Sequence, residues 1–262
     1  MRVFLFFFFL PFISCVMNTE VASDVFFEGY DFSSPKKEWV LPEKLDEISG
    51  LVYLNKSKIA CVNDEQGSIY VYDLESETIT NKIKFSSGGD YEGITYRAPH
   101  YFVIRSDGKL FRFNEKKEKL KTYDLPFTEK NNIEGLCLES DSTLLLALKG
   151  VGGKHGEKKK YKAIYRYNLN SNKTKIAYKL EFDHRVGFSG VTLNSEKDKI
   201  YILSHKSKEL ISIDRSTGNI EDVLSLDPNL FPQPEGICIS KEGRLFISNE
   251  RTEFKNARLL EF

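Results

Sequence analysis

Tyr91-Glu92-Gly93-Ile94-Thr95-Tyr96 is one of five similar stretches that recur along the chain, each with Glu or Ser, then Gly, then an apolar run. The other four start at Ile48, Ile133, Phe188 and Pro234 and read ISGLVY, IEGLCL, FSGVTL and PEGICI. Successive glycines lie 43, 42, 55 and 46 residues apart. A repeat in the forties built of strand-like sequence is typical of β-propeller blades, so the sequence predicts an all-β propeller.

Each repeat contains further strand-like segments. A second apolar run follows the first, and a third segment alternates polar and apolar residues, as in Ser68–Tyr72 and Lys109–Phe113. Alternation with period two marks a half-buried strand. A weaker fourth segment completes the first four repeats, at Thr78–Phe85, Leu120–Leu125, Thr174–Phe182 and Ile220–Leu226. Each repeat therefore predicts one four-stranded blade.

The fifth repeat ends at Phe262 after only three strand-like segments. Lys37–Leu41 leads into the first repeat as a fourth strand should, so we expect it to complete the last blade and close the ring. Closure removes sheet edges that would otherwise pair between molecules. The count favours five blades, and the alternative is a sixth built from Val25–Phe32 and irregular strands.

Composition narrows the class of protein. The 262 residues include 38 Lys plus Arg and 38 Asp plus Glu, and a chain without basic excess is a poor candidate for nucleic-acid binding. Aromatic residues make up 13% of the chain, which favours strands. No linker rich in Pro or Gly interrupts the repeats, so we expect a single domain over residues 25–262.

The first residues resemble an export signal. Met1 and Arg2 precede the apolar run Val3–Ile13, which is too short to span a membrane and is typical of a signal peptide. Ser14-Cys15 follows, a pattern similar to a lipobox. We expect residues 1–15 to hold the signal with Cys15 as the lipidation site, and residues 16–24 to be a tether. The alternative is ordinary cleavage after a small residue. The prediction is an exported envelope lipoprotein that faces the periplasm or cell surface and contacts the membrane through its lipid anchor only.

The remaining cysteines do not indicate disulfides. Without Cys15 three are left, Cys61, Cys137 and Cys238, and an odd number argues against a disulfide framework. Cys137 and Cys238 follow the repeat glycines at positions where other repeats carry Val or Thr. We interpret both as core residues.

The propeller architecture brings two sets of residues to one face. The start of each first strand and the end of each second strand lie near the central channel, on the same side. Candidate ligand or metal residues there are Glu47, Asp64, Glu92, Glu134, Glu235, Asn249 and Glu250. Carboxylates that converge are unfavourable unless a cation neutralises them, and oxygen ligands suit Ca²⁺. The alternative is structural: a carboxylate before Gly, like Ser49 or Ser189, holds neighbouring backbone groups.

Three other strand ends carry positive or titratable side chains, Arg105, Lys149 and His205. Their charge favours a small anionic ligand over a bare cation. The alternative is that each is a solvated side chain at the rim of a blade. After Lys149 comes a stretch rich in Gly and Lys within the longest repeat step. It lacks the Ser or Thr of a phosphate-binding P-loop and is either a mobile lid or a solvated insertion on the same face.

The set of motifs resembles the SdiA-regulated, or YjiK-like, family of bacterial envelope proteins. The resemblance rests on Glu47–Leu51, Gly89–Ile94, Leu203–His205, Gln233–Ile237 and Ile247–Glu250. It implies an envelope β-propeller with a link to Ca²⁺ and no settled enzymatic activity. Family members tend to carry acidic residues at some second-strand ends where this chain has Arg105 and Lys149.

Three functions remain open from the sequence. The first is a non-enzymatic module that binds a ligand or envelope protein over the polar face, with or without Ca²⁺. The second is a Ca²⁺-dependent lactonase or phosphomonoesterase that uses Glu134, Asn249, Asp64 and Glu235, which rests on analogy between folds. The third is a structural scaffold for another envelope protein.

Overall fold

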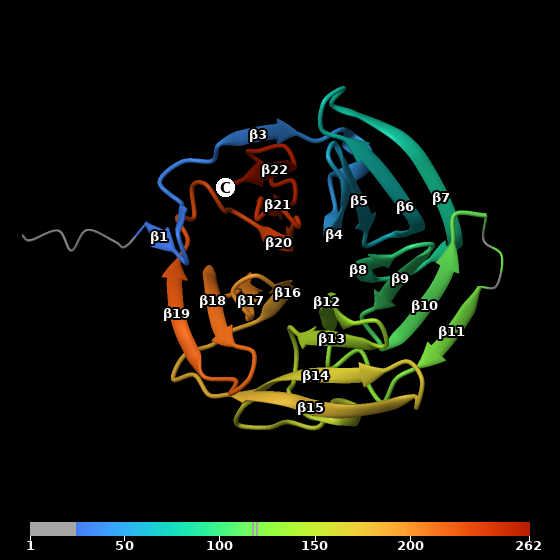
Figure 1. Ribbon diagram of the computed structural model, residues 1–262, viewed down its shortest axis with the longest axis vertical. Helices are drawn as coiled ribbons and strands as arrows, with labels where there is room; N and C mark the ends of the chain where they lie inside the picture. Colours follow the sequence, from blue (N-terminus) through green and yellow to red (C-terminus); the bar gives the residue numbers. More distant parts are fainter. Residues whose placement is uncertain (1–24, 117, 119) are drawn as a thin grey trace, which may run out of the picture.

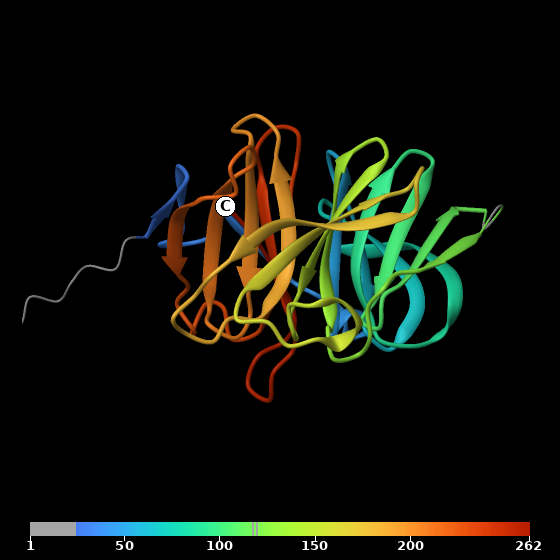
Figure 2. The ribbon, with the colours of Figure 1, turned by 90° about the horizontal axis from the view of Figure 1, so that it is seen from below.

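The computed structural model describes residues 25–116, 118 and 120–262. Cys15, the signal and the tether lie outside these residues. The described chain forms five four-stranded antiparallel sheets arranged in a ring (Figure 1). Figure 2 shows the ring from the side, with the strands roughly parallel to its axis.

The sheets follow the chain in order, each from the inner strand outward. Blade 1 contains β4 (Ile48–Asn55), β5 (Lys58–Asn63), β6 (Gln66–Asp73) and β7 (Thr78–Gly88). Blade 2 contains β8 (Tyr91–Arg97), β9 (His100–Arg105), β10 (Lys109–Asn114) and β11 (Lys121–Asp124). Blade 3 contains β12 (Ile133–Ser140), β13 (Thr143–Leu148), β14 (Lys162–Asn168) and β15 (Lys173–Leu180). Blade 4 contains β16 (Phe188–Asn194), β17 (Lys199–Ser204), β18 (Glu209–Asp214) and β19 (Ile220–Ser225).

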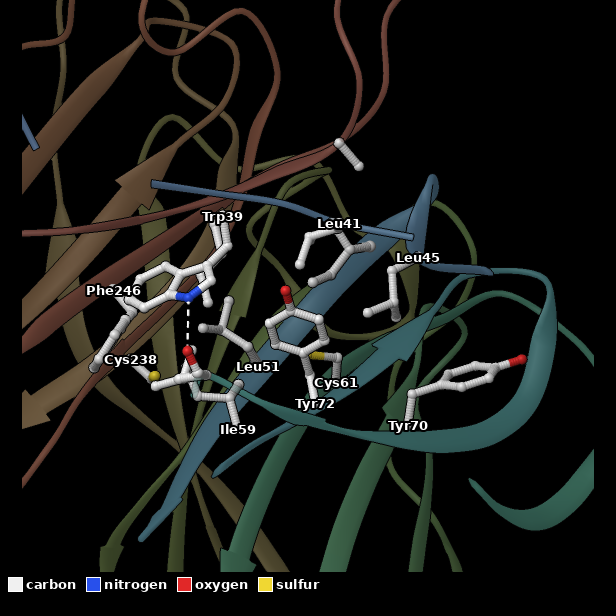
Figure 3. Close-up of a cluster of buried hydrophobic side chains, with 14 residues drawn as sticks. Trp39, Leu41, Leu45, Leu51, Ile59, Cys61, Tyr70, Tyr72, Cys238 and Phe246 are labelled. Carbon is white, nitrogen blue, oxygen red and sulfur yellow. Dashed lines mark hydrogen bonds between the residues drawn. The ribbon is translucent and has the colours of Figure 1, made fainter. Parts of the chain in front are cut away.

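Blade 5 joins the two ends of the described chain, as the sequence predicted. Its strands are β20 (Pro234–Ile239), β21 (Leu245–Asn249), β22 (Arg258–Glu261) and β3 (Lys37–Val40). Trp39 pairs with Leu259 in the register of β3 and β22. The indole of Trp39 is buried and donates to the carbonyl of Leu74 at 3.0 Å, which ties blade 5 to blade 1 (Figure 3). Ring closure therefore combines a strand pairing with a buried hydrogen bond.

The repeat glycines show why the motif requires Gly. A Cβ on Gly50 would lie 2.5 Å from the carbonyl oxygen of Glu92 in the next blade, and one on Gly93 would lie 2.6 Å from that of Glu134. Gly236 closes the circle, since its Cβ would lie 2.4 Å from the carbonyl oxygen of Ser49. Real Cβ atoms do not approach backbone this closely. The glycines therefore encircle the channel, each at the contact between neighbouring inner strands.

The space between blades is filled by apolar side chains. The cluster between blades 5 and 1 includes Trp39, Leu51, Tyr72 and Phe246, all buried (Figure 3). Cys61, Cys137 and Cys238 are buried and free, so the interpretation of the last two as core residues is confirmed. Burial raises the pKa of the Cys61 thiol to about 12, and such a thiol is inert.

The alternative of a sixth blade is wrong for the described residues. Residues 25–32 form a small hairpin of β1 (Phe26–Phe27) and β2 (Tyr30–Asp31) instead. Phe27 packs edge-on against Tyr201 at 5.2 Å between ring centroids, and Phe32 stacks on Phe262 at 4.3 Å. The aromatic residues that suggested strands thus seal the outside of blades 4 and 5. Within the described ranges, no helix combines the length and apolarity needed to cross a bilayer.

Candidate functional site

One backbone hydrogen bond recurs in every blade and brings the predicted residues to one face. The amide after each second strand donates to the carbonyl just before the first strand: Asp64 to Glu47, Ser106 to Asp90, Lys149 to Asn132, His205 to Gly187 and Glu250 to Gln233, at 2.8 to 3.3 Å. Starts of β4, β8, β12, β16 and β20 therefore lie beside the ends of β5, β9, β13, β17 and β21. The predicted polar face exists around the mouth of the channel.

The centre of this face holds an ammonium between carboxylates. Nζ of Lys149 lies 2.9 Å from Oε2 of Glu134 and 3.4 Å from Oε1 of Glu235. Glu134 and Glu235 are 2% and 4% exposed, so water screens these charges weakly. Burial opposes the charged form of Lys149, but the two carboxylates raise its pKa. We call Glu92, Glu134, Glu235, Lys149 and His205 the axial cluster.

Two neutral or titratable side chains complete the contacts of these carboxylates. Nδ2 of Asn132 donates to Oε1 of Glu134 at 2.7 Å. Nδ1 of His205 lies 2.6 Å from Oε1 of Glu235. Glu235 of blade 5 therefore lies between Lys149 of blade 3 and His205 of blade 4, and with Glu92 of blade 2 the axial cluster joins four blades. Asn132 was not among the predicted site residues, because a turn residue before a strand carries no distinctive signal.

Two carboxyl groups of the axial cluster, those of Glu92 and Glu134, have raised pKa values. Burial, together with Asp90 and Glu235, raises the pKa of Glu92 to about 8. Burial and the neighbouring Glu92 and Glu235 also raise the pKa of Glu134, against the effect of Lys149. At neutral pH the Glu92 carboxyl is therefore largely protonated and can donate a hydrogen bond.

A second group of acids, Glu47, Asp64 and Glu250, lies at the rim of the same mouth. Burial, then Glu235, Glu47 and Asp64, raises the pKa of Glu250 to about 9. Burial and Glu47 raise the pKa of Asp64 to about 6. The amide of Gln233 donates to Oε2 of Glu250. We call these three residues the rim acids; burial and the neighbouring carboxyl groups raise the pKa of two of them, Glu250 and Asp64.

Asn249 is the most unusual residue of the site. It ends β21, it is fully buried, and among the described residues neither its amide nitrogen nor its amide oxygen has a hydrogen-bond partner. Buried polar groups without partners are rare and costly in native proteins. Asn249 therefore has an amide NH2 group and a carbonyl oxygen that both lack partners among the described residues, next in sequence to Glu250.

Other predicted residues serve the scaffold. Oγ of Ser189, equivalent to the repeat Glu residues, donates to the carbonyl of Pro234 at 3.1 Å and holds blade 4 to blade 5. Arg105 makes two hydrogen bonds to Asp107, at 2.9 and 2.6 Å. The charge of Arg105 is thus neutralised within its own turn, apart from the axial cluster that contains Lys149 and His205.

The donors of the axial cluster do not fit a calcium ion between Glu134 and Glu235. The Lys149 ammonium already occupies the position between these carboxylates and supplies the positive charge. Among the residues that the structure describes, no three His, Cys, Asp or Glu side chains have an arrangement suited to a metal ion. Lys149 therefore supplies a positive charge to these two carboxylates, and a calcium ion elsewhere on this face stays a prediction.

Comparison with known proteins agrees with the propeller geometry. The family model described as SdiA-regulated matches residues 25–256. The chain belongs to the SdiA-regulated family. The resemblance found in the sequence is therefore confirmed, and the five-bladed ring is the fold of this family member.

Solved structures show the same architecture at low sequence identity. Glutaminyl cyclase from Myxococcus xanthus is 16% identical, with 87% of this chain and 94% of that chain covered and a TM-score of 0.62. A luciferin-regenerating enzyme is 13% identical, with 86% of this chain and 76% of that chain covered and a TM-score of 0.56. A chain of a nidogen/laminin complex is 12% identical, with 77% of this chain and 72% of that chain covered and a TM-score of 0.55. No curated protein matches the sequence. These likenesses concern the fold.

Proposed function

We propose that this SdiA-regulated protein is a non-enzymatic binding module of the cell envelope, which recognises a ligand over the face that contains the axial cluster. The unpaired, fully buried amide of Asn249 carries the proposal. A scaffold without a ligand would gain stability from any partner for this amide, since an orphaned buried polar group costs about 1–3 kcal/mol. Protonated Glu92 and Glu250 add further donors on the same face.

A melting-temperature screen tests this proposal. The probes are calcium chloride and panels of small carboxylates, amines and phosphate salts, each added to wild type and to Asn249→Ala. We expect at least one probe to stabilise wild type by several degrees and Asn249→Ala clearly less, since a ligand that binds only the folded state raises its stability. Equal shifts in both proteins, or no shift with any probe, would remove the proposal and favour the scaffold role.

Calcium is the probe with a specific expectation. Because Lys149 lies between Glu134 and Glu235, we expect the ion at the rim acids instead. Calcium should raise the melting temperature of wild type and of Glu134→Gln but not that of the double variant Glu47→Gln, Asp64→Asn. This result would indicate that the ion binds at the rim acids. If titration calorimetry with calcium chloride gives no heat of binding and calcium does not change the melting temperature, Ca²⁺ is removed from the proposal.

The envelope location is part of the same proposal. Labelling of cells with a clickable fatty acid tests lipidation directly, with Cys15→Ala as the control variant. We expect label on wild type only and the protein in the membrane fraction. Label on Cys15→Ala would remove the anchor, and wild type in the cytosolic fraction would remove the export signal.

A Ca²⁺-dependent hydrolase is the second candidate, favoured by one observation. A carboxyl group with a pKa near 8, as at Glu92, can give and take a proton at neutral pH, as general acid–base catalysis requires. Enzymes also occur among the structural neighbours. Lactones and phosphomonoesters assayed with and without Ca²⁺ test it. Activity unchanged in Glu134→Gln, Glu235→Gln would exclude the roles assigned to those residues.

A further inference from the structure

A pocket of about 420 Å³ opens beside the axial cluster and is lined by many cations. Its walls come from three segments: parts of 149–162, parts of 182–186, and Lys206 in the turn after β17. Its lining contains seven Lys or Arg residues and His184, and no carboxylate among the described residues. We call it the basic pocket; its volume is in the range of small-molecule sites.

Only some of these cations are neutralised by the protein. Lys149 pairs with Glu134, Lys159 with Glu157, and His184 with Asp183 and Glu209. The cations without an ion pair among the described residues are Lys158, Lys160, Lys162, Arg185 and Lys206. Lys162 donates only to backbone carbonyls, including that of Lys149 at 2.9 Å. The pocket therefore keeps a surplus of positive charge in a chain whose net charge is zero.

The unpaired cations repel one another. Burial, then Lys206 and Arg185, lowers the pKa of Lys162 to about 8. Burial, then Arg185 and Lys149, lowers the pKa of Lys206. Like charges held this close weaken the folded state unless an anion compensates them, so an anion in the pocket would relieve an unfavourable interaction that the protein itself leaves unrelieved.

The wall that carries most of the lysines is fastened to its blade. The buried side chain of Asn131 donates to the carbonyl of Val151 at 3.0 Å and accepts from the amide of Gly156 at 2.8 Å. The hydroxyl of Tyr165 donates to the carbonyl of Gly152 at 2.8 Å. These hydrogen bonds therefore hold residues 151–156 against blade 3, and the choice between a mobile lid and a solvated insertion stays a prediction.

We propose that the basic pocket binds a phosphate group of a small polyanion, such as pyrophosphate or a phosphorylated metabolite. The inference rests on the proposed function, because it names the ligand class for the same face. Several cations from three segments suit a group with at least two negative charges and several acceptor oxygens better than one carboxylate. Tyr161 and Phe182 also line the pocket and offer apolar surface to the rest of such a molecule.

Calorimetric titration with pyrophosphate tests the proposal at constant ionic strength. The pocket variant is Arg185→Met, Lys206→Met, which removes two exposed cations from different walls. The matched control is Lys121→Met, Lys175→Met, which removes the same charge from exposed positions on the outer strands β11 and β15. We expect the pocket variant to bind about tenfold more weakly or worse and the control to stay within about twofold of wild type, since only the pocket variant loses two cations that can contact the anion.

Two results would overturn the inference. One is no binding of pyrophosphate to wild type. The other is equal weakening in both double variants, which would indicate non-specific attraction. If either occurs while another probe still stabilises wild type more than Asn249→Ala, the binding module stands and only the ligand class is wrong.

The phosphate group can belong to a free molecule or to a lipid headgroup, and vesicles separate these sources. Sedimentation with phosphatidylglycerol vesicles is compared for wild type and the pocket variant, with and without pyrophosphate. Vesicle binding that pyrophosphate displaces and that the pocket variant loses identifies a headgroup. Pyrophosphate binding without vesicle binding identifies a free polyanion. If wild type and the pocket variant bind the vesicles equally, the pocket is not the site of headgroup binding.

Discussion

The axial cluster and the basic pocket share Lys149 but treat charge in opposite ways. In the axial cluster, carboxylates that start the inner strands receive an ammonium at 2.9 Å, an amide and an imidazole from the chain itself. In the basic pocket, Lys162, Arg185 and Lys206 face one another without a carboxylate among the lining residues. The first region has cations and carboxylates in contact within the fold, whereas the lining of the second leaves cations that an external anion could compensate.

Substitutions in the two regions should therefore have different consequences. Loss of a charge from the axial cluster leaves its partner buried and uncompensated, so stability should suffer. Loss of a charge from the basic pocket reduces repulsion, so stability should hold while anion binding falls. Buried position and partners, rather than charge alone, separate a structural cation from a binding one.

Lys149→Met should have the largest effect on stability. It leaves Glu134 and Glu235 buried without their cation, and loss of one partner of a buried ion pair costs about 3 kcal/mol or more. Urea unfolding at pH 7 measures the free energy of unfolding. The control is Lys206→Met, an exposed pocket cation, which we expect to stay within about 0.5 kcal/mol of wild type. A Lys149→Met protein as stable as wild type would show that the axial ion pairs are not needed.

The pH dependence of stability should report the raised carboxyls. Glu92 and Glu250, with pKa values near 8 and 9 in the folded protein, hold protons that the unfolded chain releases above its own pKa near 4.5. The folded state therefore binds more protons, and the free energy of unfolding falls as pH rises from about 5 to 8, by at most about 1.4 kcal/mol per pH unit for each group.

Urea unfolding at three pH values between about 5.5 and 7.5 measures this slope, in a window below the pKa of Lys162. The variant Glu92→Gln, Glu250→Gln should reduce it, because glutamine does not titrate, and the slope that remains comes from groups such as Glu134 and Asp64. The exposed Glu253→Gln serves as control and should keep the slope of wild type. A double variant with the full slope would mean that other groups hold the extra protons.

Arg105→Met should have the smallest effect. Arg105 lies at the end of β9 on the same face, but its guanidinium is bound to Asp107 and is only partly buried. Partly exposed pairs contribute about 0–1 kcal/mol, so melting should change little and pyrophosphate affinity should stay within about twofold. A loss of affinity as large as that of the pocket variant Arg185→Met, Lys206→Met would place Arg105 among the binding cations and extend the pocket to blade 2.

The sequence was sufficient for the fold and for the face that carries the site. The repeat Gly, the alternating third strands and the unfinished fifth repeat favoured five blades over six and predicted closure by Lys37–Leu41, because each blade is built from local strand patterns. The same repeat located Glu134, Glu235 and Lys149 on one face. The hairpin of residues 25–32 was harder to predict, since short aromatic runs have no period that separates a blade strand from a cap.

Which charged side chains lie close together could be seen only in the folded protein. Lys149 and Glu235 lie far apart in the sequence and come within 3.4 Å because the ring closes. Lys162, Arg185 and Lys206 come from three separate segments of blades 3 and 4, and no local pattern relates them. Strand periodicity depends on neighbours along the chain, whereas the energy between charges depends on their distance and burial in space. The blades could therefore be predicted from the sequence alone. The ion pairs of Lys149 and the excess of positive charge in the basic pocket could not.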